Sequence, residues 1–162
     1  MPSCRLDVLA EQVSLPQSYA DLQEKIIALS GDVAVSVPLT EVAHAAAEPP
    51  PMARFEMTLN AEASIEFAEL GNLELHPFRV SCDDQELFVG VGYTIYGAAG
   101  IAAPVLHVEE EDGAVALRIG AWQGVWLVGL GGGEMEQELR ARLERAELRA
   151  AFCARGALDT LE

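Results

Sequence analysis

Basic residues are scarce in this chain of 162 residues, which has ten lysines and arginines against 26 acidic residues. The formal net charge is −16, and residues 1–132 contain five of the bases but 19 of the acids. Proteins bind nucleic acids and anionic membrane surfaces through clusters of Lys and Arg. The shortage therefore argues against a nucleic-acid partner, and it favours plain solubility over the alternative of a protein that mimics DNA.

Cysteines are also few, and the three that occur, Cys4, Cys82 and Cys153, lie far apart in the sequence. They form no Cys-X-X-Cys pair, and their number is odd, so no disulfide framework is predicted. A reducing compartment, and with it a cytoplasmic location, is the default expectation. The first residues lack the apolar segment of a signal peptide, although a trimmed chain would look the same.

One stretch, residues 87–106, contains no charge over 20 residues and is long enough to cross a bilayer. Four glycines, Pro104 and acidic residues on both sides oppose that interpretation, because basic residues normally flank a membrane span on one side. We therefore expect a buried strand followed by a loop of small residues, and no transmembrane segment.

Aromatic residues make up only 6% of the chain, so Ala, Val and Leu must supply most of the core. Hydrophobic residues reach 51% and charged residues 22%, which is a globular composition and not that of a disordered chain. The length indicates a single domain that covers residues 1–162.

The N-terminal part predicts two short helices around a strand. Residues 14–31 have a helical apolar stripe that Ser18 or Gln17 can cap. Residues 33–37 are typical of a strand, and residues 38–48, which begin with proline and are rich in alanine, predict a second short helix.

Residues 54–70 show the strongest pattern, because apolar and polar residues alternate there without a break for 14 residues. Such alternation is typical of a half-buried strand. It predicts either one strand of roughly 40–45 Å, at about 3.3 Å per residue, or two strands joined by a loop of odd length.

The remaining chain predicts more strands and one long helix. The expected strands are 72–81, 86–97, a hairpin over 104–120 with its turn at Asp112-Gly113, and 121–130, and the expected helix covers 134–155.

Together these elements predict an α+β fold, in which a long curved antiparallel β-sheet packs against a long C-terminal helix and short helices precede the sheet. Leu139 and Leu143 of the long helix are expected to lie on the apolar face of residues 55–67. In element order alone, this arrangement resembles helix-grip and tubular lipid-binding folds.

The glycine-rich turn at residues 129–134 is the motif closest to a nucleotide-binding loop. A dinucleotide loop needs a third glycine where Glu134 stands, and it needs a second parallel strand after the helix. Glu134, Glu136 and Glu138 would also repel a phosphate at that helix terminus. Gly131 to Gly133 are therefore interpreted as a structural corner.

Other polar motifs are weak. His107 and Glu109 lie on one side of an expected strand but lack a third metal ligand, and residues 82–86 lack the ligand pattern of a calcium loop. No metal, cofactor or catalytic residue is predicted, and an enzyme is disfavoured, although a catalytic site assembled only by the fold remains a third hypothesis.

The function that these patterns favour is a non-enzymatic binding domain for an apolar small molecule or a lipid chain, held between sheet and helix. The residues expected to line the site are Phe55, Met57, Phe67, Val91, Tyr93, Trp126, Leu139 and Leu143. The alternative is an acidic protein–protein interaction domain or chaperone-like adaptor, for which a homodimer is one form.

Overall fold

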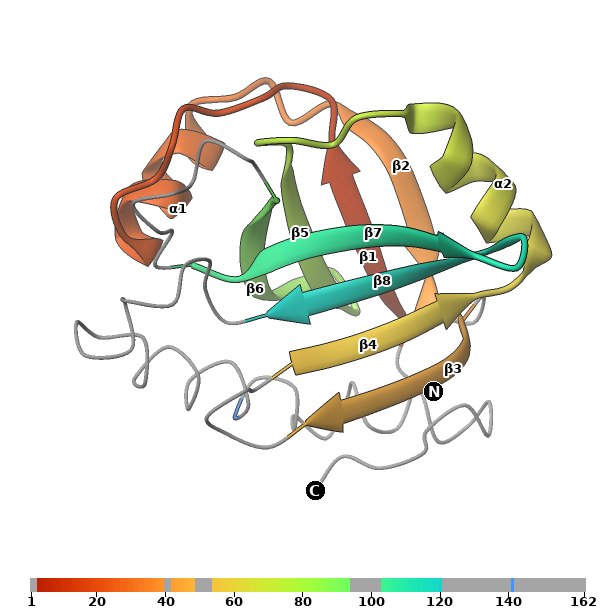
Figure 1. Ribbon diagram of the computed structural model, residues 1–162. Coiled ribbons are helices and arrows are strands. Elements are labelled where there is room, and N and C mark those ends of the chain that lie inside the picture. Colours follow the sequence, from red (N-terminus) through yellow and green to blue (C-terminus); the bar gives the residue numbers. More distant parts are fainter. Residues whose placement is uncertain (1–2, 40–41, 49–53, 94–102, 121–140, 142–162) are drawn as a thin grey trace.

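The computed structural model describes residues 3–39, 42–48, 54–93, 103–120 and 141, which form one open sheet and two short helices (Figure 1). The strands are β1 (Cys4–Leu9), β2 (Val33–Pro38), β3 (Val42–Glu48), β4 (Arg54–Leu59), β5 (Pro77–Cys82), β6 (Gln85–Gly92), β7 (Val105–Glu111) and β8 (Ala114–Gly120). The helices are α1 (Tyr19–Ile27) and α2 (Ala61–Leu70).

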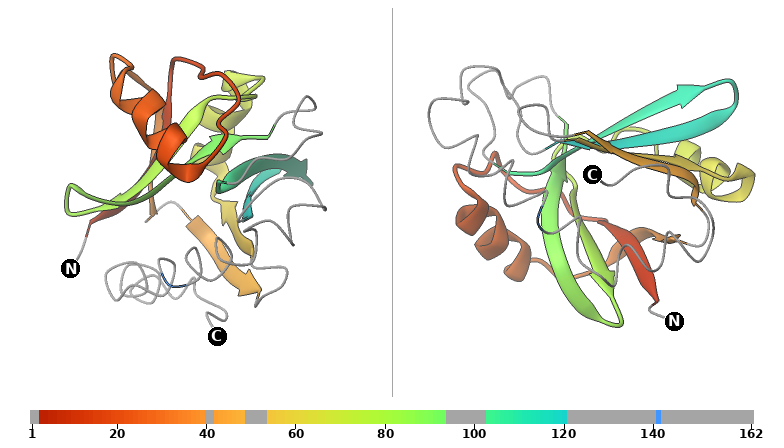
Figure 2. Two further views of the ribbon diagram at one scale, coloured as in Figure 1. Left: turned by 90° about the vertical axis from the view of Figure 1, so that its left-hand side faces the viewer. Right: turned by 90° about the horizontal axis from the view of Figure 1, so that it is seen from below.

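The sheet consists of two four-stranded halves. Its strand order is β2-β1-β5-β6-β7-β8-β4-β3, so β2-β1-β5-β6 forms the first half and β7-β8-β4-β3 the second. Neighbours within each half are antiparallel, whereas β6 and β7 are parallel and pair only through Val91 with Val105 and Gly92 with Leu106 among the described residues. Figure 2 shows the β7–β8 hairpin crossing the β5–β6 hairpin, so the two halves diverge from this short junction.

The predicted fold class is wrong beyond its α+β character. The sheet is mixed and open, its edge strands β2 and β3 lie at opposite ends of the order, and its strands have only six to eight residues. The two helices of the described chain are short, and neither matches the predicted long C-terminal helix. The strand predicted at 121–130 and, except for Ala141, the helix predicted at 134–155 lie outside the described residues.

Helix α1 confirms the helix predicted within residues 14–31. The side chain of Ser18 accepts a hydrogen bond from the backbone N–H of Asp21 at 3.0 Å and so caps the helix. Lys25 in the last turn lies 3.7 Å from Asp21, one turn earlier. Leu22 is fully buried against β6, which places α1 over the outer face of the first half (Figure 1).

The strand predicted over residues 54–70 is confirmed only for residues 54–59, which form β4. Both the single long strand and the alternative of two strands are wrong beyond it, because the chain changes from strand to helix at Asn60. The Asn60 side chain accepts a hydrogen bond from the backbone N–H of Ala63 at 3.0 Å, which caps the first turn of α2. The run after it is rich in alanine and glutamate, both good helix formers. Ala63 and Phe67 then face the core one turn apart, while Ile65 is 61% exposed.

The short helix predicted over residues 38–48 is also wrong, because most of that segment is strand β3. It pairs antiparallel with β4, from Val42 opposite Leu59 to Glu48 opposite Arg54. Alanine has a high helix propensity, but such propensities amount to a few tenths of a kcal/mol per residue. Strand pairing with β4 overrides them here. The strand predicted at 33–37 is confirmed as β2.

Both tight hairpins use residues with positive φ. Asp112 and Gly113 have φ of 50° and 81°, so the predicted turn of the β7–β8 hairpin is confirmed. Asp83 and Asp84, with φ of 51° and 64°, form the turn between β5 and β6. Aspartate tolerates the left-handed region better than most residues, which suits it to these positions.

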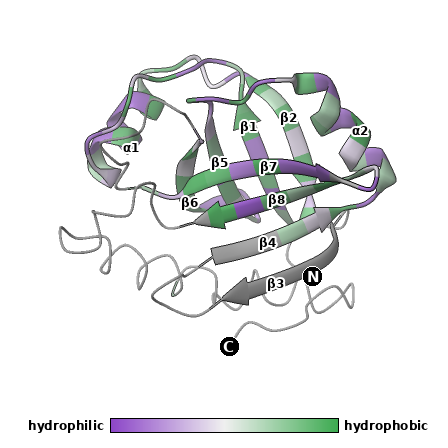
Figure 3. Ribbon diagram, viewed as in Figure 1, coloured by the Kyte–Doolittle hydropathy of each residue, from purple (hydrophilic) through white to green (hydrophobic). Residues whose placement is uncertain are grey.

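The inner faces of both halves and α2 enclose the main core. Phe78 and Phe88 make an edge-to-face contact within it, with ring centroids 6.2 Å apart. Figure 3 shows β7 changing from hydrophobic at its start to hydrophilic at its end. In β8, every second residue, Val115, Leu117 and Ile119, lies in the main core, as expected for a strand with one face on the core. Gly90 lies where a β-carbon would overlap the Phe78 ring and the Pro104 carbonyl, so the close packing of β6 depends on it.

A disulfide joins Cys4 of β1 to Cys82 of β5, which are directly opposite each other in the ladder. Both side chains are buried, and the backbone N–H of Asp83 donates to the carbonyl of Ser3 beside them. The expectation that no disulfide forms is therefore wrong for this pair, because β1 was not recognised in the sequence. Cys153 lies outside the described residues.

The charge-free stretch at residues 87–106 begins in strand β6, as expected, and residues 94–102 lie outside the described chain. Within the described part, neither helix has the length and apolar character needed to cross a bilayer.

Candidate functional site: a pocket at the junction of the two half-sheets

A pocket of about 210 Å³ lies beside the junction of the two halves. The described residues that line it are Gly71, Asn72, Leu73, Glu74, Tyr93, Leu106, His107 and Val108. They come from the loop after α2, from the residue that follows β6, and from β7. We call it the junction pocket.

Two aromatic rings form one wall of the junction pocket. The rings of Tyr93 and His107 lie with their centroids 4.4 Å apart and their planes tilted by 33°. The parallel junction positions them, because the backbone N–H of Tyr93 donates to the carbonyl of Leu106 at 2.9 Å. Tyr93 is 42% exposed, so a large part of its surface is accessible to a ligand.

The loop of residues 71–76 contributes four further lining residues, Gly71, Asn72, Leu73 and Glu74. Leu75 has a φ of 59°, which is unfavourable for leucine. Its N–H donates to the carbonyl of Gly92, and the N–H of Gly92 donates to the carbonyl of His76 at 2.9 Å. A β-carbon at Gly92 would overlap the carbonyl of Leu73. The loop therefore keeps its strained shape because it is bonded closely to the end of β6.

Where β6 and β7 separate, the hydroxyl of Tyr19 in α1 takes the place of β7 as the hydrogen-bond acceptor for β6. The N–H groups of Val91 and Tyr93 donate to carbonyls of Pro104 and Leu106, as expected for a parallel ladder. Two residues earlier, the N–H of Val89 donates instead to the hydroxyl of Tyr19 at 3.1 Å. This hydroxyl satisfies a backbone group that would otherwise be buried without a partner.

A second polar cluster lies away from the pocket, on the outer face of the first half. Asp7 is only 2% exposed, and its carboxylate lies 3.2 Å from Arg5 and 3.3 Å from Arg79. Burial alone would raise the pKa of Asp7, but hydrogen bonds from Ser36, Arg5 and Arg79 outweigh it and lower the pKa. The cluster satisfies a buried charge, and it is separated from the junction pocket.

The lining residues predicted from the sequence have different positions in the structure. Tyr93 lines the junction pocket, whereas Met57 and Phe67 lie in the main core and Val91 lies in the smaller core under α1. Phe55 is in strand β4, but its side chain is not among those that the structure describes. Trp126, Leu139 and Leu143 lie outside the described residues.

The loop of residues 71–76 was not predicted from the sequence as part of the site, and the strand predicted over 72–81 is confirmed only from Pro77 onward, as β5. The glycine and asparagine at positions 71 and 72 mark a turn, but its partner, the end of β6, lies about twenty residues later in the chain. His107 was considered only as a metal ligand. Glu109, its suggested partner, instead pairs with Arg118 at 2.8 Å.

The described side chains do not include a group of three or more His, Cys, Asp or Glu residues placed to hold a metal ion. Asp83 and Asp84, which belong to the weak calcium motif, occupy the turn between β5 and β6. The glycine-rich segment at 129–134 lies outside the described residues.

Comparisons of the chain with protein-family models, with curated proteins and with solved structures found no match.

Proposed function

We propose that this protein is a non-enzymatic binding domain that holds a small, partly apolar molecule in the junction pocket. The observation that carries the proposal is the pairing of Tyr93 and His107 beside an accessible pocket of about 210 Å³. Recessed sites with aromatic walls and a few polar groups are typical of small-molecule binding. Leu73 and Val108 supply apolar surface, and Glu74 and Asn72 supply polar groups.

The size of the junction pocket favours a small occupant. Pockets for drug-sized ligands usually measure about 300–1,000 Å³, so this one suits a molecule smaller than a lipid. The main core is occupied by buried side chains, which leaves the junction pocket as the better location for a ligand. Of the two ligands considered from the sequence, the small molecule is therefore favoured over the lipid chain.

The test is an NMR titration of the full chain with a panel of small aromatic and aliphatic compounds. A compound that binds should shift the amide signals of Tyr93, His107 and Leu73. Tyr93→Ala should weaken its binding roughly tenfold, the scale of one lost aromatic contact. Ile65→Ala removes an exposed apolar side chain outside the pocket and is the matched control. If no compound shifts these signals at millimolar concentration, the proposal is wrong.

The second candidate function is an acidic interaction domain. It is supported by exposed apolar side chains on the helices, with Ile27 82% and Ile65 61% exposed. However, α1 and α2 lie at opposite ends of the fold, so these two residues do not belong to one patch (Figure 1). Light scattering distinguishes the two candidates: a stable dimer that Ile27→Asp dissociates would favour the interaction domain.

A further inference from the structure

The edge of β7 that faces β6 is paired over only part of its length. The carbonyl of Leu106 accepts a hydrogen bond from the N–H of Tyr93, so the backbone groups of Leu106 point toward β6. Alternate residues of a strand direct their N–H and C=O groups to the same edge, so Val108 and Glu110 direct theirs to this edge too. Within the described chain, the pairing of β6 with β7 ends at Leu106, and no other strand takes its place. We call the part of this edge at Val108 and Glu110 the β7 edge.

Side-chain hydroxyls satisfy the backbone at two other ladder ends in the sheet. The N–H of Val89 donates to Tyr19 where β6 separates from β7, and the N–H of Val115 donates to Ser64 where the β4–β8 ladder ends. Among the described side chains, none bonds in this way to the β7 edge, where Val108 is 40% exposed and Glu110 is exposed as well. The β7 edge is therefore accessible for pairing with a ligand.

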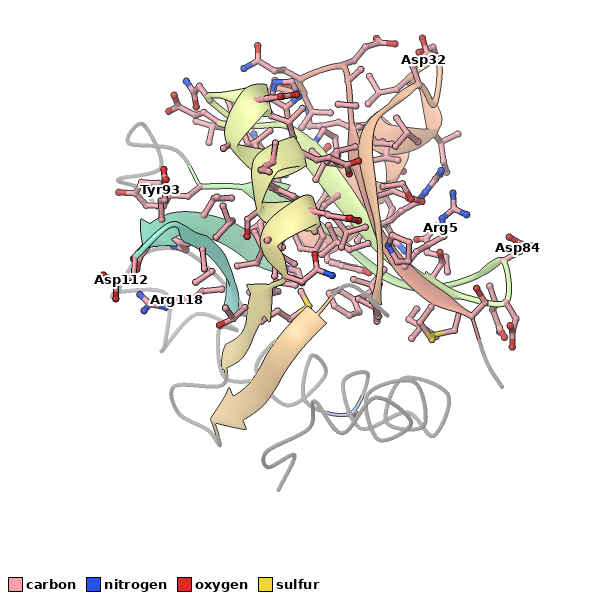
Figure 4. All side chains as sticks on the ribbon, turned by 90° about the vertical axis from the view of Figure 1, so that its right-hand side faces the viewer. Arg5, Asp32, Asp84, Tyr93, Asp112 and Arg118 are labelled. Carbon is pink, nitrogen blue, oxygen red and sulfur yellow. A yellow bond between two sulfur atoms is a disulfide. The ribbon has the colours of Figure 1, made fainter. Side chains whose placement is uncertain are left out.

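The junction pocket lies beside this edge. Three consecutive residues of β7, ending at Val108, line it. Its other lining residues, Tyr93 and the loop after α2, are attached to the end of β6, because Tyr93 bonds to Leu106 and Leu75 bonds to Gly92. The pocket is thus on the side of β7 that lacks a paired strand. Figure 4 shows Tyr93 and Arg118 on one side of the molecule and Arg5 on the other, so the Asp7 cluster is remote from this edge.

An unpaired strand edge beside a pocket is suited to an extended peptide. Such a peptide adds to a sheet as a further strand, its backbone bonds to the edge, and pockets accept its side chains. The volume of about 210 Å³ is sufficient for one large apolar side chain. The aromatic ring of Tyr93 and the side chain of Val108 offer that side chain apolar contacts.

The charge of the protein indicates the charge of the peptide. The chain carries a net charge of −16, and β7 ends in three consecutive glutamates, of which Glu110 is exposed. Glu109 is paired with Arg118 at 2.8 Å, so the argument does not depend on it. An acidic surface attracts basic partners and repels acidic ones.

We propose that the ligand of the junction pocket is a short basic peptide in extended conformation, which pairs with the β7 edge as an added strand and places one apolar side chain in the pocket. This inference rests on the proposed function, since it assigns the chemical class of ligand to the same pocket.

The probes are four pentapeptides with acetylated and amidated ends, Lys-Thr-X-Thr-Lys, in which X is Ala, Val, Leu or Phe. In NMR titrations of the full chain, the Leu or Phe peptide should shift the amide signals of Val108 and Tyr93 and slow hydrogen exchange at Val108. The Ala peptide should bind roughly tenfold more weakly, because it leaves the pocket unfilled. Glutamate in place of both lysines should weaken binding roughly threefold.

Two changes test the strand pairing itself. Methylation of the peptide's central amide nitrogens removes its backbone donors and should weaken binding roughly tenfold. Val108→Pro removes the N–H of the β7 edge and should weaken binding at least roughly fivefold, whereas Val108→Ala keeps the N–H and should weaken it less. Ile65→Ala, outside the pocket, should leave binding unchanged. If Val108→Pro fails to fold, the methylated peptide still decides.

Each contrary result has a distinct meaning. Equal binding of the plain and methylated peptides would overturn the strand pairing, and equal binding of the lysine and glutamate peptides would overturn the assignment of a basic partner. If none of the four peptides binds but a compound of the wider panel does, the peptide inference is wrong and the proposed function stands. If no peptide and no compound binds, both fail.

Discussion

The two halves of the sheet are stabilised in different ways. The first half is tied across its strands, by the disulfide between Cys4 and Cys82 and by the buried carboxylate of Asp7. In the second half, β7, β8 and β4 are linked by their ladders and by α2, whose Ser64 hydroxyl accepts a hydrogen bond from the Val115 N–H at 3.0 Å. Each half therefore has stabilising contacts of its own away from the junction, while the main core and α2, which contacts β2 as well as β4 and β8, are shared between the halves.

The junction itself has little direct pairing. Only two residue pairs join β6 to β7 within the described chain, and the 71–76 loop and Tyr19 satisfy neighbouring backbone groups there. Sites of ligand binding are often drawn from the less stable parts of a structure. The junction pocket therefore lies beside the strand pair with the fewest paired residues in the described part of the sheet.

The largest expected effect is on the first half, through loss of its disulfide. The Cys4→Ala, Cys82→Ala double variant should lose about 2–4 kcal/mol of unfolding free energy, because the bond closes a long loop in the unfolded chain. Urea denaturation measures this loss, and Cys153→Ala is the control. The unreduced, denatured protein should contain one free thiol. Three free thiols and an unchanged unfolding free energy in the double variant would contradict the disulfide.

The second prediction concerns the junction. Gly92→Ala should cost about 1–3 kcal/mol, because the added methyl group overlaps the Leu73 carbonyl and must displace the loop. The displacement should change the amide signals of Tyr93 and His107, which line the pocket. Gly113→Ala is a useful comparison, because its β-carbon would meet open space and its cost would come from the positive φ alone. If only Gly113→Ala disturbed the pocket signals, the described contact at Gly92 would be wrong.

The sequence predicted elements best where local signals decide the structure. Ser18 caps α1 and Asp112-Gly113 turns the β7–β8 hairpin, and both depend on a few adjacent residues. Strand β1 was not predicted, because the alternation of Leu6 and Val8 with Arg5 and Asp7 covers too few residues to distinguish a strand from other extended structure.

Errors arose where one pattern fits two structures. Apolar residues at 55, 57, 59, 63 and 67 fit a strand throughout, but positions 63 and 67 are also four apart and so share one face of a helix. The Asn60 cap decides between them, and it was not recognised. The parallel junction and its pocket join segments distant in sequence, which local patterns do not encode.

The third prediction tests the contact of α2 with the second half. Ser64→Ala removes the hydroxyl that accepts from the Val115 N–H and donates to the Leu59 carbonyl. A buried backbone N–H without a partner should cost about 1–2 kcal/mol of unfolding free energy. Hydrogen exchange should show faster exchange at Val115 and no change at Leu6 in the first half. Equal acceleration in both halves would mean that the halves do not stabilise independently.

The smallest expected effect is the pH dependence that Asp7 gives to the first half. Burial is outweighed by hydrogen bonds from Ser36, Arg5 and Arg79, so the pKa of Asp7 lies below its ordinary value when the protein is folded. A carboxylate whose pKa is lowered by folding stabilises the folded protein at pH values above its pKa in the unfolded chain, which is about 4. That contribution is lost as the pH falls through the pKa of the folded state.

The difference in unfolding free energy between the natural protein and Asp7→Asn, about 1 kcal/mol at pH 7, should therefore shrink below about pH 4. Urea denaturation of both proteins between pH 7 and pH 2.5, roughly the accessible acid range, measures it. If the difference in unfolding free energy between the two proteins stayed constant over that range, the charge of Asp7 would not stabilise the first half. Asp7 would then act there through its shape and packing alone, and its ion pairs would not distinguish the first half from the second.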